Sequence, residues 1–157
     1  MNVRVVVADE RQAHFFDAVK YGAPLALRHS LENPTGGKRD SDLETDRAGR
    51  RFGGTGGARY GAGVQAGHLH GVDGERSTER HELTQFAKEV AQRIHNDRVK
   101  HEFDRLIIIA GPRMLGLLRQ ALPDTCRSVI VSEISKDLAQ HDPDEIKYVL
   151  PREAFFR

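Results

Sequence analysis

Residues 3–8 read VRVVVA, and this valine-rich run decides the fold. Apart from Arg4, every side chain in the run is apolar, which predicts a largely buried strand. A second run, LIIIA, follows at residues 106–110 and a third, SVIVSEI, at residues 128–134. Because four large apolar residues in succession need cover on both faces, LIIIA should lie in the core of a sheet.

Two further segments with strand character, residues 14–19 and 25–31, follow the first run at close spacing. The residues Lys20-Tyr21-Gly22 and the nearby Pro24 supply turn chemistry between them. Short connections of this kind favour an antiparallel meander of the first three strands.

Three helices are predicted after the meander. The longest opens at Ser77, and its apolar residues recur at helical spacing, namely Leu83, Phe86, Ala87, Val90, Ala91 and Ile94. Pro112 suits the first turn of a second helix, and Asp142-Pro143 has the form of an N-cap before a short third one. Three strands followed by helix, strand, helix, strand, helix is the order of the ribonuclease H-like fold. We therefore expect one α/β domain over residues 1–157, with a mixed sheet and helices on its faces.

A glycine-rich stretch separates the meander from the longest helix. Between Gly36 and Gly74 lie 12 of the 15 glycines of the chain, which predicts a long flexible loop over roughly residues 32–75. Residues 47–72 contain no acidic side chain, so the arginines there leave a positive field. The backbone N–H groups of glycine turns also favour an anion.

Nucleic acid is the anion that suits an extended loop. Phe52 and Tyr60 are interleaved with the basic residues and could stack on bases. We expect residues 50–71 to be mobile until RNA orders them. The residues predicted to contact RNA phosphates are Arg47, Arg50, Arg51 and Arg59. A passive surface insertion is the alternative interpretation of the same stretch.

The ionisable residues do not form a recognisable metal or cofactor site. Asp9 follows the first strand and Asp104 precedes LIIIA, so the sequence does not cluster carboxylates as a two-metal nuclease requires. The pair His68 and His70, even with His81, falls short of a zinc site with its three or four fixed ligands. We therefore expect no metal and no cofactor.

Composition excludes several classes of protein. The net charge is +1 at pH 7, so global charge does not mark a nucleic-acid binder. Cys126 is the only cysteine, which excludes a disulfide framework. The sequence shows no signal peptide and no apolar run of about 18 residues. We expect a cytoplasmic protein without a membrane partner.

Three ordered motifs resemble those of the bacterial host attachment protein family. The first is Thr45-Asp46-Arg47-Ala48-Gly49-Arg50, the second begins Gly111-Pro112-Arg113, and the third is Lys136-Asp137-Leu138. The VVVAD of residues 5–9 also matches. The name of the family implies a role in attachment to host cells. In the first motif, Asp46 and Arg47, which stand ahead of Gly49, are expected to fix the base of the loop through side-chain-to-backbone bonds and an ion pair, with Gly49 as a structural residue of that base.

The family is also similar to the middle domain of the archaeal and eukaryotic peptide-chain release factor. That domain has a ribonuclease H-like fold and carries a Gly-Gly-Gln loop before its long helix. Gly56 and Gly57 are the nearest match and are the candidate catalytic residues, although Ala58 stands where the relative has glutamine. The resemblance predicts a release-factor-like domain that binds the ribosome or tRNA, with hydrolysis of peptidyl-tRNA esters left open. The alternative is a non-enzymatic interaction protein required for attachment to host cells.

Overall fold

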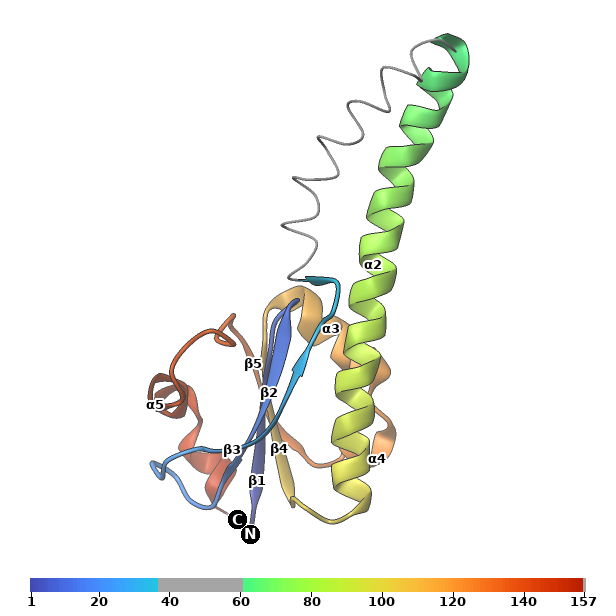
Figure 1. Ribbon diagram of the computed structural model, residues 1–157. Helices are drawn as coiled ribbons and strands as arrows, with labels where there is room; N and C mark the ends of the chain where they lie inside the picture. The colour runs from blue at the N-terminus through green and yellow to red at the C-terminus, as the bar shows by residue number, and fades with distance from the viewer. Residues whose placement is uncertain (37–60, 157) are drawn as a thin grey trace.

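The computed structural model describes residues 1–36 and 61–156, with the backbone alone described for residues 61–77. A five-stranded sheet forms the centre of the molecule, and helices cover it (Figure 1). One long helix, α2 (Gly61–Val99), projects well beyond the end of the sheet.

The sheet is mixed, and its strand order is β3-β2-β1-β4-β5. Strands β1, β2 and β3 form the antiparallel meander, whereas β4 runs parallel to β1 and β5 runs parallel to β4. The predicted mixed sheet is therefore confirmed, and it has five strands over the described residues. The strands are β1 (Val3–Ala8), β2 (Gln12–Ala18), β3 (Ala26–Glu32), β4 (Arg105–Ala110) and β5 (Ile130–Ser135).

The shorter helices follow the strands. Pro112 occupies the first turn of α3, as predicted. The Asp142 side chain caps α5 by accepting a hydrogen bond of 2.9 Å from the backbone N–H of Asp144, which confirms the predicted N-cap. These elements are α3 (Pro112–Ala121), α4 (Asp124–Arg127), α5 (Pro143–Ile146) and the 3₁₀ turns η2 (Lys147–Val149) and η3 (Arg152–Phe155).

The start of α2 corrects the sequence interpretation. The glycine content predicts a loop to residue 75 and a helix from Ser77, but α2 begins at Gly61. A glycine inside a helix costs only about 1 kcal/mol relative to alanine, and no proline interrupts residues 61–99. The helix that packs on the sheet can therefore continue through the glycines. Residues 37–60 of the predicted loop lie outside the described residues.

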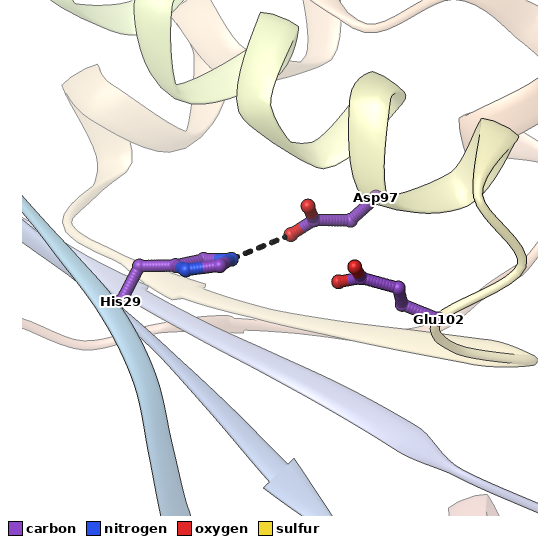
Figure 2. Close-up of side chains that lie close together, drawn as sticks. All are labelled: His29, Asp97 and Glu102. Carbon is purple, nitrogen blue, oxygen red and sulfur yellow. Dashed lines mark hydrogen bonds and ion pairs between the residues drawn. The ribbon is translucent and has the colours of Figure 1, made fainter.

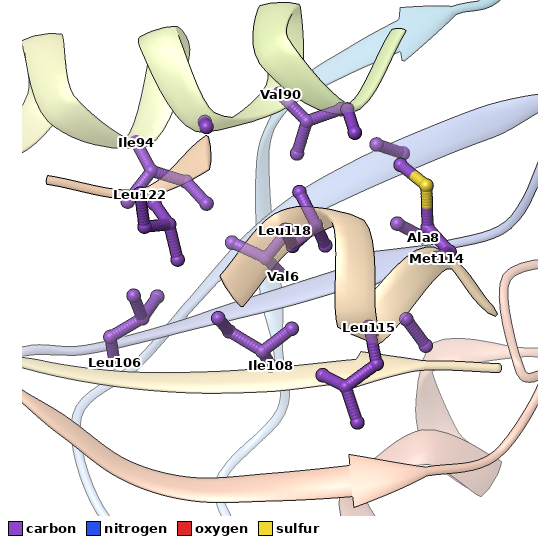
Figure 3. Close-up of a cluster of buried hydrophobic side chains, with 14 of the residues drawn as sticks. Val6, Ala8, Val90, Ile94, Leu106, Ile108, Met114, Leu115, Leu118 and Leu122 are labelled. Carbon is purple, nitrogen blue, oxygen red and sulfur yellow. The ribbon is translucent and has the colours of Figure 1, made fainter. Parts of the chain in front are cut away.

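Two hydrophobic clusters, one on each face of the sheet, make up the core. On one face, the side chains of Val6, Leu106 and Ile108 pack with α2 and α3 (Figure 3). The predicted apolar residues of α2, from Leu83 to Ile94, are all buried in this cluster. On the other face, the intervening strand residues pack against the segment that contains α5, η2 and η3; they are Val3, Val5, Val7, Ile107 and Ile109. Residues 106–109 are fully buried, which confirms their predicted core position.

Both edge strands of the sheet carry a bulge. The register between β2 and β3 shifts at Phe15/Phe16, which leaves Arg28 as an extra residue on β3. The register between β4 and β5 shifts at Leu106/Ile107, which leaves Val131 as an extra residue on β5. The sheet is therefore irregular at its two margins and regular at its centre.

The two ends of the sheet differ. Val3 pairs with Ala18 on one side and with Arg105 on the other, so the start of β1, the end of β2 and the start of β4 meet at one end. The N-terminus and C-terminus lie at this end, whereas α2 begins far beyond the opposite end (Figure 1). Among the described residues, no helix combines the length and the apolar character needed to cross a membrane.

Candidate functional site

A cluster of buried and partly buried ionisable side chains lies between the sheet and the last turn of α2. We call it the Arg4 cluster, and its members are Arg4, Asp17, His29, Asp97 and Glu102. Strands β1, β2 and β3 each supply one residue, α2 supplies Asp97, and the turn after α2 supplies Glu102. Figure 2 shows the side chains of His29, Asp97 and Glu102 converging from three parts of the chain.

Arg4 is the centre of this cluster, and its side chain is fully buried. Its Nε atom donates to Asp17 Oδ1 at 2.6 Å, and its Nη1 atom donates to Asp97 Oδ2. Its Nη2 atom lies 3.5 Å from Glu102 Oε2, close enough for an ion pair but without a hydrogen bond. The guanidinium also lies over the ring of Phe103, 5.3 Å from its centroid. The cross-strand pairing of Arg4 with Asp17 in the β1–β2 register positions the first of these contacts.

Opposing effects act on the pKa of Arg4. Burial on its own lowers this pKa, but the hydrogen bond and charge of Asp17, together with those of Asp97, more than offset the burial and raise it above its ordinary value. The guanidinium therefore stays charged, and its carboxylate partners compensate a cation that would otherwise be very costly to bury.

His29 connects β3 to α2. Its Nε2 atom lies 3.1 Å from Asp97 Oδ2, and its ring meets the ring of Phe15 edge-on with centroids 5.6 Å apart. Arg93 Nη2 is 2.8 Å from both ring nitrogens of His29. A nitrogen equally close to both must lie over the ring face, because in the ring plane it would collide with the carbon between them. We therefore interpret this contact as stacking rather than as two hydrogen bonds.

The same residues raise the question of a metal ion. His29, Asp97 and Glu102 each offer one ligand atom, and these atoms lie within 4.8 Å of one another. However, Arg4 already contacts both carboxylates, and Arg93 Nε lies 3.4 Å from Asp97 Oδ1. A divalent cation would have to displace or approach these guanidinium groups, which opposes its binding.

The number of positive and negative charges at the Arg4 cluster also argues against a metal ion. The three carboxylates of the Arg4 cluster face three guanidinium groups, because Arg28 Nε lies 3.4 Å from Asp17 Oδ2 in addition to the contacts of Arg4 and Arg93. Three negative and three positive charges give a sum of zero before any ion is added. The arrangement is suited to holding β1, β2, β3 and α2 together rather than to coordinating a metal.

The residues that the sequence singled out as a site cannot be compared with this cluster. All eight lie in the stretch 37–60, outside the described residues, so their predicted roles stay predictions; they are Asp46, Arg47, Gly49, Arg50, Arg51, Gly56, Gly57 and Arg59. The side chains of His68 and His70 are also outside the described set.

Asp9 and Asp104 are turn residues. Asp9 Oδ1 accepts hydrogen bonds from the backbone N–H groups of Arg11 and Gln12 at 2.7 and 2.8 Å, and Asp104 accepts one from the backbone N–H of Asn2 at 2.8 Å. Cys126 is buried in α4, and burial raises the pKa of its thiol despite opposing effects of Thr125 and Arg98. None of these three residues belongs to the Arg4 cluster.

Sequence reasoning missed the Arg4 cluster, although one signal was present. Arg4 interrupts the valine run of β1, and a charged residue in a fully buried strand requires a partner of opposite charge. That argument predicts a carboxylate near Arg4. It does not identify Asp97, which is 93 residues away in the chain.

The fold and the cluster together define an α/β protein whose buried charges are neutralised internally. Residues 4–150 match the model of a family described as "Protein required for attachment to host cells". The match covers most of the chain, so this protein belongs to that family, and the resemblance drawn from its motifs is confirmed.

The family match corrects the predicted function. The interpretation of the chain as a release-factor-like, ribosome- or RNA-associated domain is wrong, because the family is described by attachment to host cells. The comparison gives no support to a relation with the peptide-chain release factor. The alternative drawn from the sequence, a protein required for attachment, agrees with the match.

One curated relative shares a shorter stretch with the chain. It is an uncharacterized protein of Rickettsia prowazekii (strain Madrid E), which is 44% identical over 46 residues. The aligned stretch spans 29% of this chain and 31% of the relative, so well under two thirds of either protein is compared.

Proposed function

We propose that this protein serves the attachment of a bacterium to its host cell as a non-enzymatic interaction protein. The match of residues 4–150 to the attachment family is the observation that carries the proposal. It spans the elements from β1 to η2, so the proposal concerns nearly the whole folded domain.

The described structure is consistent with an interaction role. Its partly buried histidine–carboxylate group is occupied by the guanidinium groups of Arg4 and Arg93. These contacts make His29 and Asp97 part of the packing between β3 and α2, not a reactive pair open to a substrate. The chemistry of this cluster therefore favours a stable platform over a catalyst.

The fold supports a finer assignment within the same proposal. We assign the sheet to the ribonuclease H-like type, because an antiparallel meander is followed by two parallel strands in the order β3-β2-β1-β4-β5. An experimental structure whose β1–β4 and β4–β5 crossovers are right-handed would agree with this assignment. A left-handed crossover would contradict it.

Deletion of the gene in the bacterium that encodes it tests the attachment role. We expect adherence to cultured host cells to fall and to be restored by the wild-type gene, with growth rate measured alongside. Two matched variants extend the test, Arg4→Met at the fully buried arginine and Arg113→Met at an arginine whose side chain is 54% exposed. Arg113→Met should restore adherence, and Arg4→Met should not, because it removes the centre of the buried cluster. A deletion strain that adheres like its parent contradicts the proposal.

A further inference from the structure

Exposed apolar side chains gather at the end of the sheet where the chain termini lie. Val19 is 71% exposed, Val99 61%, Phe156 54% and Tyr21 43%. We call these four residues the apolar end. Large apolar side chains this exposed are uninformative singly, but a group of them at one place marks an interaction surface.

The contacts of the strand ends bring these residues together. Val19 follows Ala18, the last residue of β2, which pairs with Val3. The carbonyl of Phe156 accepts a hydrogen bond of 2.6 Å from Arg105 Nη1, and Arg105 also pairs with Val3. Both residues therefore lie beside the start of β1.

Tyr21 and Val99 complete the apolar end. The ring of Tyr21 meets the ring of Phe155 at 6.1 Å between centroids, which holds the β2–β3 turn against η3. Gly22, with φ of 79°, closes the tip of this turn in a conformation that glycine adopts without strain. Val99 is the last residue of α2. A few residues later, the backbone N–H of Asp104 donates to the carbonyl of Asn2 at 2.8 Å, which places this part of the chain beside the N-terminus.

Exposed cations border the apolar end. Lys20 adjoins Val19, Lys100 adjoins Val99, and the guanidinium of Arg152 lies 5.5 Å from the centroid of the Phe156 ring. Two acidic residues, Asp104 and Glu153, are exposed at the same end, and Asp104 is bonded to the backbone N–H of Asn2. The surface thus combines apolar tips with a positive border.

We propose that the apolar end docks on an anionic lipid surface, with Val19, Tyr21, Val99 and Phe156 entering the interfacial layer and Lys20, Lys100 and Arg152 contacting headgroups. Apolar and aromatic tips bordered by lysine and arginine suit the boundary between headgroups and acyl chains. Long basic side chains can also reach anionic headgroups while their stems lie along the apolar layer.

The shape of this end favours a lipid surface over a protein partner. Its exposed apolar residues come from the β2–β3 turn, a helix end and the C-terminal segment, rather than from one helix or strand face of the kind that binds a peptide. They are also far apart in the sequence, so no single segment of the chain carries this surface. From the sequence we expect no membrane partner, and that expectation rests on the lack of a signal peptide and of a long apolar run; docking at a lipid surface requires neither of them. The inference does not rest on the attachment role.

Co-sedimentation of the full chain with vesicles tests the proposal. We expect binding to vesicles of equimolar phosphatidylcholine and phosphatidylserine, weak binding to phosphatidylcholine alone, and loss of binding as salt is raised. Lys20→Gln with Lys100→Gln should weaken binding roughly tenfold or more, since each basic residue contributes a factor of about five. Lys136→Gln is the matched control, because this exposed lysine follows β5 at the opposite end of the sheet and its loss should leave binding unchanged.

The apolar side chains are tested separately. Val19→Ser with Val99→Ser should lower vesicle binding about tenfold. Both positions are exposed, so the unfolding midpoint in urea should stay at the wild-type value. Wild-type protein that ignores phosphatidylserine vesicles overturns the proposal, as does a serine variant that folds normally and binds them like the wild type. Vesicle binding can fail while adherence still depends on the gene, so this test and the deletion test are distinguishable.

Discussion

At the residue scale, Arg4 is a charged side chain at the centre of the described core. Its charge is fully buried, and three carboxylates and an aromatic ring surround it. A buried ion pair adds little net stability compared with well-packed apolar residues, but removal of one partner leaves an uncompensated charge in the interior. The loss of the arginine would therefore destabilise the protein mainly by leaving its carboxylate partners without a compensating charge.

Arg4→Met should destabilise the protein by about 3–5 kcal/mol, because Asp17 and Asp97 would lose the cation that compensates their burial. Urea unfolding monitored by circular dichroism measures this loss. Arg113→Met is the control, since the Arg113–Glu10 pair is exposed on both sides and should be worth at most about 1 kcal/mol. Equal stabilities of the two variants would show that the Arg4 cluster is not the charge centre described here.

Gly36 is a second position where a single added side-chain atom should change the stability of the protein. A Cβ atom there would lie 2.8 Å from the carbonyl oxygen of Glu10 and 3.2 Å from the Cα of Arg11. Because both contacts are with backbone, we expect Gly36→Ala to cost about 1–3 kcal/mol in unfolding free energy. Gly116→Ala in α3 is the control, where nothing lies within 4 Å and helix propensity should raise stability by up to about 1 kcal/mol. A neutral Gly36→Ala would show that the turn after β1 moves freely away from residue 36.

At the element scale, the central strands and the packed part of α2 follow from sequence pattern. The continuous apolar run of β4 and the helical spacing from Leu83 to Ile94 each specify one buried surface. The first part of α2 does not follow from pattern, because its glycines favour a loop by propensity. In this first part, the backbone continues the helix that is already packed on the sheet.

Ile108→Ala should lower the free energy of unfolding by about 2–5 kcal/mol, since this side chain is fully buried in the middle of β4. The midpoint and slope of a urea transition give the value. Val131→Ala on β5 is the comparison, because Val131 is 43% exposed and should lose well under half as much. A loss below about 1 kcal/mol at Ile108 lies outside the range for a core isoleucine and would place β4 at the margin of the core.

At the scale of the whole molecule, the sheet is covered by unlike partners on its two faces. One face is covered by α2, α3 and α4, and the other by the segment of short turns from Ala139 to Phe155. Figure 1 shows these two covers on opposite sides of the sheet. Since β1 and β4 contribute to both clusters, the two covers should unfold together.

Ile146→Ala tests that coupling. Ile146 is 1% exposed in the second cluster, so its truncation should cost about 2–5 kcal/mol and shift the same transition that reports on α2. Tyr148→Ala, two residues along at a side chain that is 78% exposed, should change stability by less than about 0.5 kcal/mol. Loss of the C-terminal segment in a separate, earlier transition would show that the two faces are independent.

Local pattern predicted the sheet but not the cluster beneath α2. The burial of a run such as VRVVVA can be predicted from its adjacent apolar residues. In contrast, Arg4, His29 and Asp97 come into contact only after the meander and α2 have packed. His29 is also one of eight histidines, and nothing in its neighbours distinguishes it. The partners in an ion cluster depend on long-range geometry, so the sequence shows that Arg4 needs a partner without showing which one.

The bulges on β3 and β5 bear on whether the protein self-associates at high concentration. A regular edge strand offers an unbroken ladder of hydrogen-bonding groups that a neighbouring chain can extend. The extra residues Arg28 and Val131 interrupt the regular repeat of both edge strands, and Arg28 adds a charge that an incoming strand would meet. The sheet should therefore stop at five strands, so that concentrated protein resists edge-to-edge polymerisation into fibrils.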